Sequence, residues 1–296
     1  MKKIQGQEYK EISVHKADKC PYCKNKKIVK NGYRFNHTKK KQRYICKECD
    51  RTFVVDDGFK KMKSERELIT CCLDLYMNGM SLRKIEAHIN QFSQEKITYR
   101  SIHNWIIRYA KLLNSFSQSF DLNLSRQYHT DEIFVKCKGE QHYFWDIIDK
   151  GTRMLIATHY SEKRDSKSAR MLFLKVKNRP LTLFTDGLQG YQKAVRKVFG
   201  TLHKDRKVQY IRLRANKDKR NNIVERIQGT IRERIKVMRA FKNKKDAELF
   251  LDLFVVYYNF IRVHQGIGMT PIEKAGVELG LGENKWLDLI YRARGL

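Results

Sequence analysis

The chain has 296 residues, of which 41% are hydrophobic, so it is long enough for two or three domains with at least one substantial core. It carries 62 Lys and Arg against 32 Asp and Glu, a formal net charge of +30, which favours a polyanionic partner over a merely soluble basic surface. The N-terminus lacks an apolar run and the longest apolar stretch, residues 249–261, is interrupted by Asp252 and Asn259, so we expect a cytoplasmic protein without a signal peptide or membrane span.

Residues 1–60 are expected to form a zinc ribbon. Four cysteines stand in two CxxC pairs that are separated by 22 residues typical of a β-hairpin: Cys20, Cys23, Cys46 and Cys49. Four thiolates at this spacing can close a tetrahedral, structural site around Zn²⁺, and a reducing compartment favours such a site over disulfides. The other cysteines lack this spacing and are expected to be buried thiols: Cys71, Cys72 and Cys137.

The ribbon segment is also strongly basic. Residues 1–63 contain 19 basic and 7 acidic residues. A ribbon of this charge is expected to contact nucleic-acid phosphates, and a solvated charged face is the alternative.

Residues 64–114 are expected to form three helices of a helix-turn-helix. Apolar residues recur at helical spacing from Glu65 until Asn78, Ser81 caps a second helix, and a third begins near Thr98. The polar face of the third helix offers five donors: Arg100, His103, Asn104, Arg108 and Lys111. Such a face suits a recognition helix in the major groove of double-stranded DNA, and a three-helix spacer is the alternative. The segments NGMSLRKIEAHI and RSIHNWI resemble the helix-turn-helix of transposases and site-specific recombinases.

Residues 125–275 are expected to form an α/β domain, followed by a helical tail over residues 276–296. Three β-rich segments, at 128–135, 142–149 and 153–160, predict an antiparallel meander. Helices and strands then alternate: a helix around 169–176, a strand at 181–185, a helix through 198, a strand at 208–213 and a long helix from about residue 221. This order predicts an RNase H-like domain, a mixed five-stranded sheet with flanking helices.

Two acidic residues in this domain stand in apolar surroundings. An acidic residue within or at the end of an apolar strand is costly unless it is paired or metal-bound, and this description fits Asp131 and Asp186. Their hard oxygen ligands suit Mg²⁺ or Mn²⁺. Glu132 could exchange roles with Asp131, Asp186 could instead cap a turn or helix, and Asp146 and Asp149 are further acidic residues nearby.

Five segments resemble, in this order, the catalytic domain of small bacterial and archaeal insertion-sequence DDE transposases: HTDEIFVKCKGEQHYFWDIID, SEKRDSKSARMLF, LFTDGLQGYQKAV, NNIVERIQGTIRERIKVMRAFK and YYNFIRVHQGIGMTP. They span residues 128–272. The resemblance implies two divalent cations held by Asp131, Asp186 and Glu225, and metal-dependent nicking and joining of DNA strands at the ends of the element. It also implies a prokaryotic, nucleoid-associated protein that acts on transposon ends and target DNA as a homodimer or higher oligomer.

The resemblance selects Glu225 over Glu233 on the long basic helix, with Arg232 in a supporting contact to DNA. Arg232 returns to nearly the same helix face seven residues after Glu225, whereas Glu233 is rotated by roughly 80°. The 38 residues between Asp186 and Glu225 leave room for an inserted loop around residues 214–220.

Two other functions fit part of the sequence. A non-catalytic DNA-binding regulator would need the ribbon, the helix-turn-helix and the charge, but not three matching carboxylates. A plain RNase H-like nuclease would not need two N-terminal DNA-binding modules.

Overall fold

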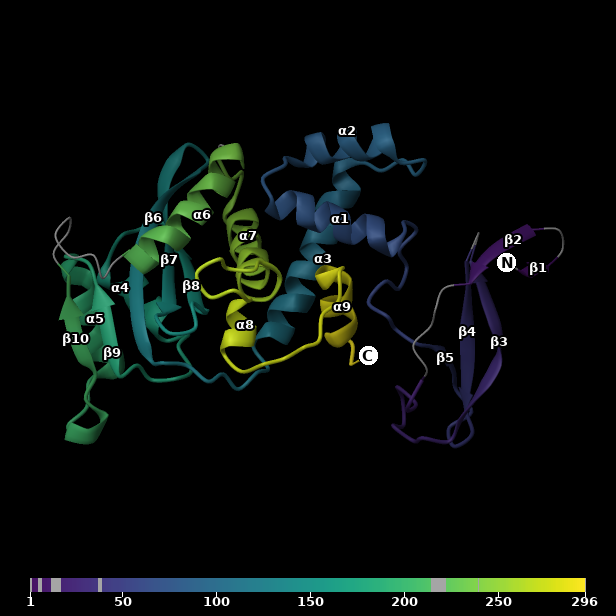
Figure 1. Cartoon of the computed structure of the whole chain (residues 1–296), viewed down its shortest axis with the longest axis horizontal. Coiled ribbons are helices and arrows are strands. Elements are labelled where there is room, and N and C mark those ends of the chain that lie inside the picture. Colours follow the sequence, from purple (N-terminus) through teal and green to yellow (C-terminus); the bar gives the residue numbers. More distant parts are fainter. Residues whose placement is uncertain are drawn as a thin grey trace. The chain divides into compact units, whose positions relative to one another are not determined.

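The computed structural model describes residues 2–4, 7–11, 17–36, 39–213, 222–238 and 240–295 (Figure 1). Within these ranges, no helix combines the length and the apolar composition needed to cross a membrane. The chain divides into two compact units, Met1–Glu65 with Leu289–Leu296 and Arg66–Asp288.

The first unit is built on a small β-sheet. β3 (Ile28–Asn36) and β4 (Lys39–Cys46) form the antiparallel hairpin that the sequence predicts. Three shorter strands complete the sheet: β1 (Lys2–Ile4), β2 (Gln7–Glu11) and β5 (Thr52–Val54). In its small core the Tyr44 ring stacks on the Phe53 ring, with centroids 5.8 Å apart. So few apolar side chains supply little stability, and small modules of this kind are commonly stabilised by a metal.

Three helices open the second unit, as the sequence predicts: α1 (Arg66–Met77), α2 (Leu82–Phe92) and α3 (Tyr99–Ser117). The side-chain oxygen of Ser81 accepts a hydrogen bond from the Lys84 amide, and that of Thr98 accepts one from the Ser101 amide. Both caps satisfy amides that have no partner within their helices. Gly79 ends the turn after α1 at a φ of 104°, a left-handed conformation that glycine adopts without strain.

The three cysteines outside the CxxC pairs do not share one environment. Cys72 and Cys137 are buried as predicted, whereas Cys71 is exposed, which corrects the expectation of a buried thiol. Neighbouring residues of a helix point about 100° apart, so Cys72 reaches the apolar interior while Cys71 faces solvent.

The larger sheet has the strand order β10-β9-β6-β7-β8. Its five strands are β6 (Gln127–Cys137), β7 (Glu140–Asp149), β8 (Leu155–Ser161), β9 (Thr182–Thr185) and β10 (Gln209–Arg212). β6, β7 and β8 pair antiparallel, while β9 runs parallel to β6 and β10 runs parallel to β9. This is the mixed five-stranded sheet predicted for an RNase H-like domain.

Helices cover both faces of this sheet. They are α4 (Ser166–Phe173), α5 (Gln189–Phe199), α6 (Asn222–Met238) and α7 (Lys244–Val256). Successive residues of a strand point to opposite faces, and in β7 the Trp145 ring meets Tyr191 of α5 while the Phe144 ring meets Phe250 of α7. α4 and α5 therefore pack on one face, and α7 packs on the other.

The remaining elements are short: the 3₁₀ turn η1 (Lys204–Arg206), the π-helical turn η3 (Tyr257–Ile261), α8 (Pro271–Lys274) and α9 (Lys285–Arg292). η3 continues directly from α7. Its Asn259 side chain is buried and bonds both backbone groups of Leu155, accepting from the amide at 2.9 Å and donating to the carbonyl at 3.0 Å. These bonds tie η3, and with it the end of α7, to β8.

Candidate active site

Two acidic side chains meet where β6 and β9 lie side by side. Asp131 lies within β6, and Asp186 directly follows β9. The two strands run parallel and pair residues 127–129 with 182–184, so Asp131 and Asp186 reach the same level of the sheet. One carboxylate oxygen from each, and one from Glu132, lie within 4.8 Å of one another. The structure thus brings together two of the three carboxylates selected from the sequence and adds Glu132.

Glu132 is held by two partners that sequence reasoning did not select. Its carboxylate accepts a hydrogen bond from the Tyr191 hydroxyl at 2.6 Å and pairs with the Arg164 guanidinium, which also lies 3.4 Å from an oxygen of Asp186. Because strand residues alternate, Glu132 points toward α5 and Asp131 points to the opposite face. The Glu132 amide donates to Asp131 Oδ1 at 2.9 Å, which helps to fix the Asp131 side chain.

The crowding of these carboxylates opposes their ionisation. Burial, together with the negative charges of Glu132 and Asp186, raises the pKa of Asp131 to about 7, although the hydrogen bond from the Glu132 amide acts in the opposite direction. Burial also raises the pKa of Glu132, although the Tyr191 and Arg164 contacts act in the opposite direction. A cation among these oxygens would favour the ionised forms.

Asp146 is a further acidic residue on the Asp131 side of the sheet. It is the cross-strand partner of Asp131 and is only 1% exposed. Burial raises its pKa well above the ordinary value, and the charges of Asp131 and Glu132 raise it further. Neither Asp146 oxygen is within hydrogen-bonding geometry of a donor among the described residues, but the buried Gln228 amide of α6 is close enough to lower its pKa.

Asp149, the last residue of β7, has a structural role instead. Its oxygens accept hydrogen bonds from the Ser125 hydroxyl at 2.7 Å, the Arg126 amide at 2.9 Å and the Thr152 hydroxyl at 2.8 Å. These bonds hold the entry to β6 against the β7–β8 turn. Asp149 therefore stabilises the fold.

Glu225 lies in the first turn of α6, is exposed, and does not belong to the converged group of carboxylates. Arg232, two turns later, is also exposed and donates to Gln228 Oε1 at 3.3 Å. Helical geometry places both on the flank of α6 that carries Gln228, whose amide lowers the pKa of Asp131. The expected inserted loop at residues 214–220 lies outside the described residues.

Glu233, the alternative to Glu225, belongs to another flank of α6. It lines a cavity together with Thr230 and Arg234. The cavity is also bordered by the end of α1 and by η3. Glu233 therefore lies beside a separate feature of the molecule.

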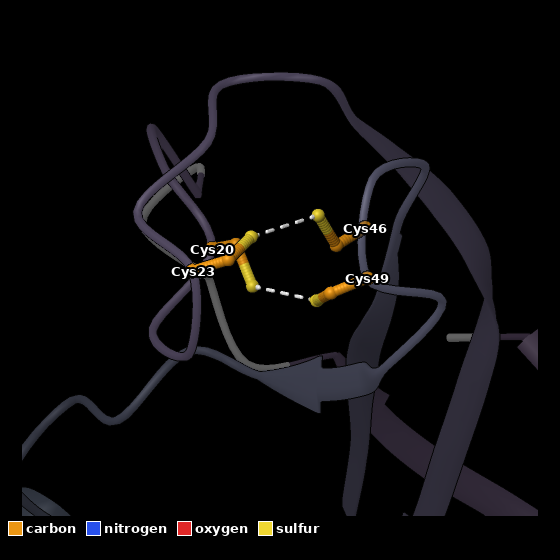
Figure 2. A group of neighbouring side chains, drawn as sticks. All are labelled: Cys20, Cys23, Cys46 and Cys49. Atoms are coloured by element: carbon orange, nitrogen blue, oxygen red, sulfur yellow. Dashed lines mark hydrogen bonds between the residues drawn. The ribbon is translucent and has the colours of Figure 1, made fainter.

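The two CxxC pairs converge in the ribbon as predicted (Figure 2). The Sγ atoms of Cys20 and Cys49 lie 3.7 Å apart, and those of Cys23 and Cys46 lie 3.5 Å apart. A tetrahedron with Zn–S bonds of about 2.3 Å has sulfur–sulfur edges of about 3.8 Å. The four free thiols therefore fit a closed tetrahedral metal site.

The five donors expected on the recognition helix are not equally accessible on α3. Three are exposed: Arg100, Asn104 and Lys111. His103 is half-buried, and its Nε2 lies 3.8 Å from Asp246 of α7. Arg108 is half-buried as well, with its guanidinium 5.9 Å from the centroid of the Tyr109 ring. Part of the predicted DNA-binding face is thus packed toward the α/β domain.

Comparison with known proteins identifies the segment that contains these carboxylates. Residues 125–264 match a family model described as the DDE domain, of the IS240 transposase type. Residues 125–264 are a DDE domain. Both Asp131 and Asp186, and also Glu225, fall within it.

The similarity to proteins of insertion elements extends beyond the DDE domain. The 48.3 kDa protein of insertion element ISM1 from Methanobrevibacter smithii is 23% identical over 275 residues, covering 83% of this chain and 68% of that protein. A protein in transposable element ISH50 from Halobacterium salinarum is 25% identical over 203 residues, covering 58% of this chain and 63% of that protein. The chain spans about two thirds of the length of these relatives.

Two solved structures are similar to part of the chain at low sequence identity. The HTLV-2 integrase catalytic core domain in complex with magnesium is 16% identical, with a TM-score of 0.38 over 52% of this chain and 99% of that chain. The simian T-cell lymphotropic virus intasome in complex with PP2A regulatory subunit B56 gamma is 14% identical, with a TM-score of 0.41 over 70% of this chain and 75% of that chain.

Proposed function

We propose that the protein is a DNA transposase that nicks and joins DNA strands at the ends of an insertion sequence by metal-dependent phosphoryl transfer. The observation that supports this most directly is the meeting of Asp131 and Asp186 on adjacent parallel strands of a DDE domain. Similarity to proteins of two insertion elements supports the same function.

The donor set fits two divalent cations, Mg²⁺ or Mn²⁺. Asp131, Asp186 and Glu225 would hold them through hard carboxylate oxygens. Burial and the neighbouring carboxylates raise the pKa of Asp131, and a bound cation would balance the negative charge of this group. When bound, such a pair of ions activates a water or a 3′-hydroxyl and stabilises the leaving oxygen.

Protein groups around the carboxylates would keep each of them in place. Arg164 and Tyr191 hold Glu132 toward α5, which favours Asp131 as the metal ligand of the adjacent acidic pair. Arg232 orients the Gln228 amide, which lies close to Asp131. The charge of exposed Arg232 would also steady a DNA phosphate beside the carboxylates.

The N-terminal modules would hold the DNA. Zn²⁺ bound by the four CxxC cysteines would keep the basic ribbon folded. The exposed residues of α3 would contact double-stranded DNA: Arg100, Asn104 and Lys111. Arg108 and His103 would lie at the edge of this contact. His103 would first have to break its contact with Asp246. Transposon ends and target DNA are then the partners, and pairing of two ends calls for a homodimer or a higher oligomer.

The experiment is to incubate the protein with Mg²⁺ and duplex DNA from the ends of its own element, and to map nicks and joined products. Asp131→Asn and Asp186→Asn should each abolish nicking while DNA binding persists, because binding rests on other modules. A regulator would bind the ends without any Mg²⁺-dependent nick, and a plain nuclease would nick them without joining.

A further inference from the structure

A cavity of about 380 Å³ lies in the second unit between the turn after α1 and the C-terminal half of α6. Its polar lining comes from Asn78, Thr230, Glu233, Arg234, Tyr257 and Arg262. The walls are completed by apolar side chains from α1, α6 and α7. The cavity therefore lies between the three-helix region and α6, the helix that carries Glu225.

Arg234 is the unusual member of this lining. It is 3% exposed, its guanidinium lies 4.3 Å from the centroid of the Tyr76 ring, and Nη2 makes one long contact of 3.5 Å to the Met80 carbonyl. Its Nε and Nη1 find no acceptor among the described residues. A buried guanidinium with unpaired donors is costly unless an acceptor or a negative charge is supplied to it.

The other charges of the lining favour an anion. Arg262 adds a second guanidinium, which donates to the Thr230 hydroxyl at 2.8 Å. Glu233 is the one acidic residue of the lining, so two cations face one carboxylate. Guanidinium groups suit the several acceptor oxygens of a phosphate, and two of them would repel a metal cation.

We propose that this cavity binds a phosphate group through Arg262 and the Arg234 charge, and that its occupant is a phosphate of the DNA backbone. The choice of DNA rests on the function proposed above. The cavity lies between the end of α1, in the three-helix region proposed to hold DNA, and α6, the helix that carries Glu225. The shared chemistry is the phosphate itself, and a free phosphate ion is the other possible source.

The first test measures binding of inorganic phosphate to the full chain by calorimetry, at constant ionic strength and without Mg²⁺. Arg262→Gln should weaken binding by about tenfold or more, because a charge-assisted hydrogen bond is lost. Glu233→Gln should tighten binding, because a repelling carboxylate is removed. The matched control is Arg226→Gln, an exposed arginine of the same helix outside the cavity lining, which should leave the affinity unchanged.

Equal phosphate affinity in Arg262→Gln and Arg226→Gln, or weaker binding in Glu233→Gln, would overturn the site. Arg234→Gln can be added as a variant, but it would also remove the packing of Arg234 on Tyr76. The test therefore depends on the Arg262 and Glu233 variants. Phosphate binding needs neither metal nor cleavage. A protein that binds phosphate here but cuts no DNA would therefore contradict the transposase proposal and leave this site standing.

The second test separates the two sources of phosphate. If DNA occupies the cavity, an end duplex should displace inorganic phosphate, and Arg262→Gln should reduce the log–log salt slope of DNA affinity by about 0.9, the value for one phosphate contact. An unchanged slope, with weakened binding of inorganic phosphate, would overturn the assignment to DNA.

Discussion

At the scale of single residues, the centre consists of carboxylates whose surroundings come from distant parts of the chain. Asp131 and Asp186 could be selected from the sequence because the resemblance to a transposase family assigns them, and the cost of acidic residues in apolar strands supports that assignment. The partners of Glu132 could not, because Arg164 and Tyr191 are 32 and 59 residues away and no local pattern links them to it. Which of the two adjacent acids faces which side depends on the orientation of the strand in the sheet.

Binding of Mg²⁺ should depend on pH with a sign set by Asp131. Because its pKa is raised to about 7, this carboxyl carries a proton in the metal-free protein below that pH, and a metal ligand must be ionised. Apparent Mg²⁺ affinity should fall by about tenfold per pH unit below about pH 7, and should level off above about pH 8. Calorimetric titrations between about pH 5.5 and about pH 8.5 measure this. A flat profile over that range would contradict it.

Asp146→Asn should stabilise the protein at neutral pH. Since burial raises the pKa of Asp146, the folded state keeps a proton that the unfolded state loses above about pH 4, and stability falls as pH rises through this range. Asparagine has no such proton, so the gain in melting temperature should be larger at about pH 7 than at about pH 4. Asp149→Asn is the control, and it should destabilise because Asp149 accepts hydrogen bonds that hold a turn. A variant at Asp146 that melts lower at neutral pH would refute the argument.

At the scale of elements, local patterns predicted most of the helices and strands but not their neighbours. Caps at Ser81 and Thr98 and the alternation along β6 to β8 are local signals, and the structure has these elements near the predicted positions. The side-by-side placement of β9 and β6 joins residues more than 50 positions apart, so no local pattern predicted it, and it followed only from the order of elements typical of an RNase H-like domain. α7 was not predicted, although its buried residues Ala247, Phe250, Leu251 and Phe254 recur at helical spacing, because the continuous apolar run over residues 249–261 obscures that period.

The ribbon should depend on its metal while the α/β domain does not. Cys46→Ser should remove one bound Zn²⁺ per chain, unfold β3 and β4, and weaken DNA binding, because the ribbon core is small. Metal analysis and amide NMR spectra measure the first two effects, and signals of the larger sheet should persist. Cys71→Ser is the matched control, since Cys71 is exposed and lies outside the cluster. Retention of Zn²⁺ and of ribbon signals in Cys46→Ser would rule out the site.

At the scale of the whole molecule, the net charge of +30 should make DNA affinity strongly dependent on salt. Each phosphate that is neutralised should contribute about −0.9 to the log–log slope.

Arg100→Ala or Asn104→Ala should reduce the preference for end DNA more than it reduces non-specific affinity, because both residues are exposed on α3. Binding titrations with end and scrambled duplexes at several salt concentrations measure both effects, and an affinity that ignores salt would count against DNA as the partner.

The central claim is that Glu225 completes a metal-dependent active site with Asp131 and Asp186, and a strand-transfer assay tests it most directly. The assay follows Mg²⁺-dependent joining of a pre-nicked end duplex to a plasmid by wild type, Glu225→Gln and Glu233→Gln. Glu225→Gln should bind DNA but form no joined product, whereas Glu233→Gln should still form it. Normal joining by Glu225→Gln together with loss of joining in Glu233→Gln would contradict the assignment and would require a different register for α6.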